Sequence, residues 1–424
     1  MRAILRPVER SPPPPTVWRR AQWRVLLATS FCYLFYYTGR QNFGWAIPGL
    51  RQDLGLTNTQ LGWISGAGLV TYGLGQMVSG HLGNRFGNRR LVVAGALLSC
   101  ALNWLTGFAR GVWSLGTPWA ANGLAQALGF APGSHLIAHW WGPRERGVAF
   151  GVFSFAAGFS SVLTFLGAML VLGRLDWRWV FRLPVLLMVA GALVFHALVR
   201  DRPEHVGFPP PDGVPADRGP GQAPSLRADY REVLGNRRFL IASLGFGFNN
   251  WARLGLLGWV PVHFLGSAWR EDPGAAWITL ALPAGMALGA LASGYGADRY
   301  LRADHARLIA PCLALATLTI LGMYGAPRDA SGLGVVLLFV GGFLVFGPLT
   351  SFNALGAELV GGHAMGTAIG FMNAVGYGTA ALGDVVIGVA LDATGRTESM
   401  FLVTSAACLL GAACGAAIRR MPSG

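Results

Sequence analysis

The 424-residue sequence contains no lysine, so all 33 of its basic residues are arginine. A nucleotide-binding P-loop needs a lysine to reach the β- and γ-phosphates, and Schiff-base chemistry needs a primary amine. The missing lysine therefore argues against ATP-driven pumping at a site in this chain. No catalytic constellation stands out either, and we expect the protein not to be an enzyme and to need no cofactor or metal.

Charged residues are also scarce, at 12% of the chain, while 53% of the residues are hydrophobic and the mean hydropathy is +0.46. Soluble domains carry roughly 25% charged residues. Apolar runs of about 20 residues, enough to cross a hydrocarbon core of about 30 Å, recur along the whole chain. They show no alternation with period two, which excludes a β-barrel. The sequence therefore predicts an all-α integral membrane protein, and its arginine clusters between spans argue against nucleic-acid binding.

Cysteine is rare, and its placement excludes a disulfide framework. The five cysteines all fall within apolar runs: Cys32, Cys100, Cys312, Cys408 and Cys414. An odd number of buried cysteines reads as small packing residues. The N-terminal stretch "MRAILRPVERSPPPPTVWRRAQWR" lacks the apolar core of a signal peptide. Its six arginines predict a cytoplasmic N-terminus.

Hydropathy predicts twelve membrane spans, six on each side of one long polar stretch. Their approximate cores are 25–48, 60–82, 91–109, 114–137, 148–172, 179–199, 239–265, 276–297, 308–325, 333–357, 365–390 and 400–418. The polar stretch contains "FPPPDGVPADRGPGQAPS", which cannot cross a membrane. The predicted domains are a cytoplasmic tail (1–23), a six-helix bundle (24–199), a cytoplasmic linker (200–237), a second six-helix bundle (238–418) and a cytoplasmic tail (419–424).

Arginines between the spans predict the topology. The side shared by the N-terminus and the linker carries Arg85, Arg89, Arg90, Arg144, Arg146, Arg299, Arg302, Arg307, Arg419 and Arg420. The opposite side carries chiefly Arg51, Arg110, Arg174, Arg178, Arg270, Arg328 and Arg396. This bias agrees with an even number of spans and with both termini in the cytoplasm.

The two halves resemble each other. Gly80 and Gly294 open similar loops at an offset of 214 residues (294 − 80), and Arg40 and Arg253 are offset by 213 (253 − 40). Each arginine is followed eight positions later by a proline, with Gly-Trp in between. A parallel duplication of this kind is typical of transporters built from two bundles related by an axis along the membrane normal.

Arg40 and Arg253 both lie inside predicted spans. Arg40 is 11 residues before Arg51 (51 − 40), which is about 16 Å along a helix. A charge at such depth costs about 2.5–3.5 kcal/mol on insertion scales and normally faces a cavity or a partner. A structural ion pair with Asp384 or Glu358 would neutralise one arginine and leave the other without a counter-charge. We therefore favour two arginines that face each other across the bundle interface and clamp an anion bidentately.

Several motifs resemble those of the organophosphate:phosphate antiporters, a branch of the major facilitator superfamily. They are "YYTGRQNFGWAIPGL", "HWWGPRERG", "WARLGLLGWVP" and "GGFLVFGPLTSFNALGAELV…GTAIGFMNAVGYG", and the resemblance covers nearly the whole chain. It implies uptake of glycerol phosphate or a sugar phosphate in exchange for inorganic phosphate by alternating access. It also implies that Arg40 and Arg253 hold the phosphate, with Tyr36, Tyr37 and Tyr377 nearby.

The sequence departs from this family pattern at three positions. Gln76 stands where relatives carry a lysine, Ala157 aligns with a histidine of glycerol-phosphate carriers, and Asn250 replaces a tyrosine. We keep Gln76 and Asn250 as candidate substrate contacts. The site thus loses auxiliary cations, while Asp384 adds a carboxylate. We hypothesise a substrate that is less anionic than a sugar-phosphate dianion or that carries its own amine.

Two loop motifs, "GHLGNRFGNRR" and "GADRYLR", resemble the cytoplasmic gating motif of the superfamily, with Asn84 at the acidic position of the first copy. We expect "RER" after the fourth span to form salt bridges between helices on the cytoplasmic face. The predicted gating residues are Arg85, Arg144, Glu145, Arg146, Asp298 and Arg299.

The expected mechanism is rocking of the two bundles about a site near the bilayer midplane. Two uncompensated guanidinium groups repel each other when the empty site closes, and a bound anion removes that cost, so exchange is favoured. The expected protein is a monomeric carrier in the bacterial inner membrane, with inorganic phosphate as counter-substrate. Two alternatives stay open: a carrier of another organic anion, coupled to protons through Asp384 or Glu358, and a non-transporting sugar-phosphate sensor.

Overall fold

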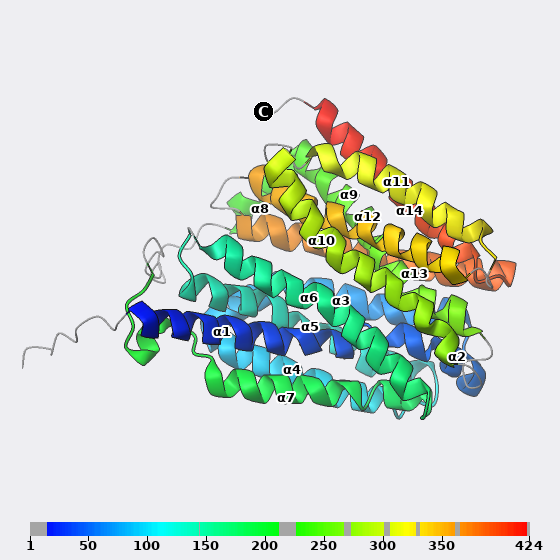
Figure 1. Cartoon of the computed structure of the whole chain (residues 1–424), viewed down its shortest axis with the longest axis horizontal. Helices are drawn as coiled ribbons and strands as arrows, with labels where there is room; N and C mark the ends of the chain where they lie inside the picture. The colour runs from blue at the N-terminus through cyan, green and yellow to red at the C-terminus, as the bar shows by residue number, and fades with distance from the viewer. Residues whose placement is uncertain are drawn as a thin grey trace, which may run out of the picture.

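The computed structural model describes residues 15–143, 145–211, 226–266, 273–300, 306–327, 331–360 and 365–421. Its first half is a helical bundle, in the lower part of Figure 1. The helices are α1 Pro15–Tyr36, α2 Phe43–Leu54, α3 Asn58–Phe86, α4 Asn88–Thr106, α5 Val112–Trp140, α6 Arg146–Leu172 and α7 Pro184–Leu198. Because α1 and α2 together form the first span, these helices make six spans.

The second half forms a matching bundle in the upper part of Figure 1. Its helices are α9 Arg237–Leu265, α10 Ala281–Tyr300, α11 Ala306–Gly325, α12 Ser331–Glu358, α13 Met365–Thr394 and α14 Ser399–Arg420. The prediction of twelve spans in two six-span bundles is therefore confirmed, with the first span made of two helices. The linker also contains a short helix, α8 Leu226–Gly235, which the sequence did not predict.

Six of the described helices are long and apolar enough to cross a membrane by length and composition alone. They are Arg146–Leu172, Trp177–Leu198, Ala306–Gly325, Ser331–Gly356, Met365–Thr394 and Ser399–Arg420. The first span does not meet this criterion because α1 carries Arg19, Arg20 and Arg24 in every 18-residue window and α2 has only 12 residues.

The predicted first span, 25–48, is not one continuous helix, and this part of the prediction is wrong. α1 ends at Tyr36, a 3₁₀ turn follows at Tyr37–Gly39, and α2 begins at Phe43. Arg40 lies in the break, where its φ of −130° and ψ of −36° depart from helical geometry. Irregular backbone at membrane depth is tolerated where it is buried in protein or lines a cavity. A functional site is therefore expected beside the break.

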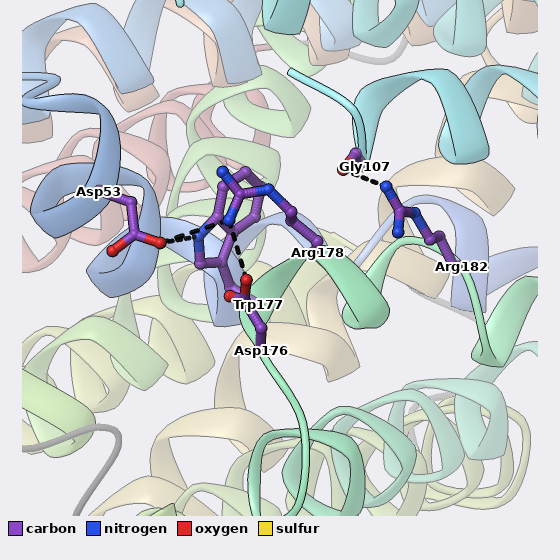
Figure 2. Close-up of polar contacts among 6 residues, drawn as sticks. All are labelled: Asp53, Gly107, Asp176, Trp177, Arg178 and Arg182. Atoms are coloured by element: carbon purple, nitrogen blue, oxygen red, sulfur yellow. Dashed lines mark hydrogen bonds and ion pairs between the residues drawn. The ribbon is translucent and has the colours of Figure 1, made fainter. Parts of the chain in front are cut away.

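The second helix of the broken span, α2, is attached to its own bundle (Figure 2). Asp53 accepts hydrogen bonds from Trp177 Nε1 at 3.0 Å and from the Arg178 guanidinium at 3.4 Å. A Cβ on Gly49 would lie 2.3 Å from the Trp177 ring, so only glycine lets this indole lie against α2. Nearby, Arg182 donates to the Gly107 carbonyl at 2.7 Å. These contacts make α2 and the start of the sixth span one rigid unit.

The buried apolar residues show how the bundles meet. We call the end of the molecule that carries Pro15 and Arg420 the terminal face, and the end that carries Leu54 and Thr394 the distal face. Toward the distal face one continuous apolar cluster draws on both bundles, from Phe43 to Cys408. Toward the terminal face each bundle has a separate cluster of its own. The two bundles are therefore packed together distally.

Close backbone approaches and a helix cap strengthen the distal contact. A Cβ on Gly44 of α2 would lie 2.1 Å from the Gly258 carbonyl oxygen of α9, so the two helices cross through glycine. On α13, Asp392 caps the start of α3 in the other bundle. Its carboxylate accepts hydrogen bonds from the backbone N–H groups of Asn58 and Thr59 at 3.0 and 2.8 Å and from both side chains at 2.7 Å. A carboxylate at a helix N-terminus is favourable for charge as well as for hydrogen bonding.

Candidate functional site

A small cavity lies between the bundles beside the break in the first span. Its volume is about 40 Å³, enough for a few water molecules. The lining residues come from α2, α3, α9, α13 and the break itself: Arg40, Gln41, Phe43, Gly44, Ile47, Ser65, Leu69, Leu254, Leu257, Gly258, Trp259 and Asp384. Arg40 and Asp384 bring opposite charges to a wall that is otherwise mostly apolar.

Arg40 is held by aromatic faces and not by a carboxylate. Its guanidinium carbon lies 4.2 Å from the ring centroid of Tyr37 and 4.6 Å from that of Tyr72. Tyr72 makes an edge contact with Tyr377 of α13, with ring centroids 4.6 Å apart. Among the described residues, no ion pair to Arg40 is found. Cation–π contacts orient the guanidinium without neutralising it, so its charge is free to bind an anion.

A buried polar network beneath Arg40 supports the helix break. The Gly39 carbonyl accepts hydrogen bonds from Asn122 Nδ2 at 2.7 Å and from Asn103 Nδ2 at 3.1 Å. Asn103 Oδ1 in turn accepts one from Asn42 at 3.1 Å. A Cβ on Gly39 would lie 2.9 Å from Gln126 Nε2, so a side chain there would push the network apart. These contacts take the place of the helical hydrogen bonds that the break removes, and so fix the position of Arg40.

Asp384 is the acidic residue of the cavity lining and is only 3% exposed. Its carboxylate accepts hydrogen bonds from Ser65 Oγ of α3 at 2.6 Å and from Trp259 Nε1 of α9 at 3.2 Å. The sequence left open an ion pair between Asp384 and one of the two arginines, and no such pair is found among the described residues. In the part of the chain that the structure describes, only these two neutral donors are found on the carboxylate.

Arg253 is 5% exposed and is not among the residues that line the cavity, although Leu254 and Leu257 of the same helix are. Its guanidinium donates to Asn250 Oδ1 through Nη2 at 2.8 Å and through Nε at 3.2 Å. It also lies 5.7 Å from the ring centroid of Phe346. Asn250 thus supplies a neutral acceptor at the position where the sequence predicted a substrate contact.

Five other predicted site residues are not in the cavity lining; Tyr37 and Tyr377 belong to the aromatic group around Arg40, and Tyr36, Gln76 and Glu358 lie elsewhere. Tyr36 is 1% exposed, donates its hydroxyl to the Val92 carbonyl and packs on Gly129, so it belongs to the core of the first bundle. Gln76 is buried on α3, and its side-chain Nε2 lacks a hydrogen-bond partner. Glu358 is exposed at the last residue of α12.

The predicted gating residues divide into four groups. Glu145 forms the expected ion pair between helices, with Arg19 of α1, and this hydrogen-bonded contact holds the pKa of the Glu145 carboxyl below its usual value. Arg146 instead donates hydrogen bonds to the backbone carbonyls of Ala138 and Trp141 at the end of α5. No salt bridge of Arg146 is found among the described residues. Arg85 is exposed beside the Phe86 ring. Arg144 and the side chains of Asp298 and Arg299 lie outside the described residues.

Sequence reasoning missed three residues of this site: Tyr72, Ser65 and Trp259. Tyr72 lies four residues before Gln76, hence on the same face of α3, and that spacing could have identified it. Trp259 belongs to the repeated Gly-Trp that marked the duplication, but a hydrogen bond from its indole to Asp384 depends on the packing of α9 against α13. Ser65 carries no local signal.

Two pseudo-symmetric six-helix bundles around a small, mostly apolar cavity, with Arg40 and Asp384 on its wall and no ion pair to either among the described residues, define a membrane transporter and not an enzyme. The family model of the Major Facilitator Superfamily matches residues 29–384. The chain therefore belongs to the Major Facilitator Superfamily, and it is a multi-pass membrane protein.

Two curated relatives extend this result, and both are transporters of organophosphates by name. The chain is similar to the "Glycerol-3-phosphate transporter" of Bacillus subtilis (strain 168), with 24% identity over 418 residues that cover 93% of this chain and 91% of the relative. It is also similar to the "Probable hexose phosphate transport protein" of Chlamydia pneumoniae, with 25% identity over 392 residues that cover 88% and 86%. These relatives agree with the organophosphate:phosphate antiporter resemblance and support an anionic substrate.

A solved structure confirms the fold. The bacterial homolog of the human lysosomal transporter Spinster, in an inward-facing and unoccupied conformation, matches with a TM-score of 0.74 over 95% of this chain and 99% of that chain. The sequence identity is 14%, so the likeness is one of fold alone.

Proposed function

We propose that this protein exchanges a small organophosphate for inorganic phosphate across the bacterial inner membrane by alternating access. Arg40 carries the proposal, because it lies in a helix break on the cavity between the bundles and, among the described residues, has aromatic partners and no carboxylate. A guanidinium in that setting is free to bind phosphate through two hydrogen bonds.

In this proposal Arg253 joins Arg40 on the phosphate as the bundles close around it. The acceptor that Arg253 now uses, Asn250 Oδ1, is neutral, so a phosphate oxygen can replace it with a gain in charge–charge energy. With both termini in the cytoplasm, the distal face is outside the cell and this conformation is closed to the outside. The monomer suffices, because the site is built from one chain.

Phosphate exchange in proteoliposomes tests the proposal. Vesicles loaded with unlabelled phosphate should take up external radiolabelled phosphate, and uptake should fall to background when the vesicles contain no phosphate. If uptake instead needs only an inward proton gradient and no internal phosphate, the carrier is a proton symporter and the exchange proposal is wrong. If folded, inserted protein shows binding without flux, a sensor is the better description.

We expect Asn103→Leu to weaken the apparent affinity for phosphate in this assay about tenfold, because it removes a donor to the Gly39 carbonyl and leaves buried polar groups unsatisfied at about 1–3 kcal/mol. Asn103 does not line the cavity, so its effect must act through the position of Arg40. Thr319→Val, at a half-buried position of α11 that does not line the cavity, is the near-isosteric control for the loss of one side-chain hydrogen bond. An unchanged KM with a lowered melting temperature would mean that the network serves stability alone.

A further inference from the structure

We infer that the organic substrate is a zwitterion, a small phosphate ester that carries an ammonium group, with Arg40 binding the phosphate and Asp384 binding the ammonium. The inference rests on the proposed function and narrows its substrate class. It starts from one geometric fact, which is that both charged side chains line the same small cavity between the bundles.

Asp384 is built to present a charge and not to pair internally. Its two oxygens accept one hydrogen bond each, from Ser65 and from Trp259, and a carboxylate can accept about four. The two donors are neutral and come from different bundles, so they orient the carboxylate without cancelling its charge. A buried carboxylate without a cation is costly, and a bound ammonium removes that cost.

A dianionic sugar phosphate fits this cavity poorly. Its phosphate can bind Arg40, the cation of the lining, but it has no cation of its own to place beside Asp384. The rest of the lining is mostly apolar, with Phe43, Ile47, Leu69, Leu254 and Leu257, and gives few partners to sugar hydroxyls. A short aliphatic chain between a phosphate and an ammonium suits both the charges and the apolar wall.

Ser65 and Trp259 make the site sensitive to bundle position. Because one donor is on α3 and the other on α9, Asp384 has both hydrogen bonds when the bundles are packed as they are here. A ligand that bridges Asp384 of the second bundle and Arg40 of the first therefore joins the two bundles, as the Ser65–Asp384 hydrogen bond also does. The residues that bind the substrate are thus the ones that hold the bundles together at the cavity.

Two probes that differ in one group test the inference: 2-aminoethyl phosphate and 2-hydroxyethyl phosphate, each used to inhibit radiolabelled phosphate exchange in proteoliposomes at pH 7. In the wild type we expect the amine to inhibit at about tenfold lower concentration, as a charge-assisted contact in a buried site predicts. In Asp384→Asn we expect the two probes to inhibit equally. Glu204→Gln, an exposed carboxylate outside both bundles, should keep the tenfold difference.

Equal inhibition by the two probes in the wild type, or an amine preference that survives in Asp384→Asn, would overturn the inference while leaving phosphate exchange standing. If the wild type exchanges no phosphate, the proposed function fails, and binding of the same two probes to purified protein by calorimetry decides the inference separately. The wild-type comparison needs no variant, so it holds even if Asp384→Asn does not fold.

Discussion

Replacing Arg40 by alanine is expected to abolish phosphate exchange in proteoliposomes. Removing one partner of a buried, hydrogen-bonded charge pair costs about 2–5 kcal/mol, which is a loss of roughly thirtyfold to several thousandfold. Arg40 has no substitute on the cavity, because the other lining residues of the described cavity are neutral or, in Asp384, acidic. We expect Arg253→Ala to give the same loss if the second guanidinium moves from Asn250 to the phosphate.

Arg40→Lys separates charge from shape. Lysine keeps the positive charge but offers a point charge in place of the planar fork, and it stacks less well between Tyr37 and Tyr72. We expect at least about a tenfold loss of exchange. Arg110→Ala and Arg110→Lys, at an exposed loop position, are the matched controls and should keep wild-type rates. If Arg40→Ala exchanges phosphate at the wild-type rate, Arg40 does not bind the phosphate.

The second large effect is expected from Gly44→Ala. Its Cβ would lie 2.1 Å from the Gly258 carbonyl oxygen, and a backbone atom cannot rotate out of the way as a flexible side chain can. Overpacking of this kind costs about 1–3 kcal/mol. That is enough to shift an equilibrium between two conformations by roughly five- to hundredfold toward the state in which α2 and α9 are apart. Exchange should fall accordingly, because the cycle needs the distal face to close.

Distances across the distal face measure this shift directly. Spin labels at Arg51 and Arg396, both exposed and on different bundles, should move apart in Gly44→Ala in a background free of the five native cysteines. Gly258→Ala is the matched control, since its added Cβ meets nothing within 4 Å although the residue lies at the same crossing. An unchanged distance distribution in Gly44→Ala would show that α2 and α9 can adjust around a methyl group without opening the face.

The helices and their order were predictable because hydropathy is a local property. The runs that form α3 to α7 and α9 to α14 are apolar enough to be recognised from composition, whereas α8 was not predicted. The break between α1 and α2 was missed because the run through it is just as apolar. Tyr37, Gly39 and Asn42 carry no signal stronger than a helix pattern, and the amides that hold the break, Asn103 and Asn122, come from other spans. A tertiary network overrode a local preference.

Composition, hydropathy and residue spacing were enough to predict the class of protein, its duplicated halves and the two arginines at membrane depth. The groups that those charges contact could be read from the packed helices alone. Asp384 is held by Ser65 and Trp259 and is separate from Arg253, while Arg253 is held by Asn250. The physical reason is that hydropathy and spacing give the depth of a residue in the membrane. Its partners depend on how each helix is rotated and on how closely glycines such as Gly44 let neighbouring helices approach.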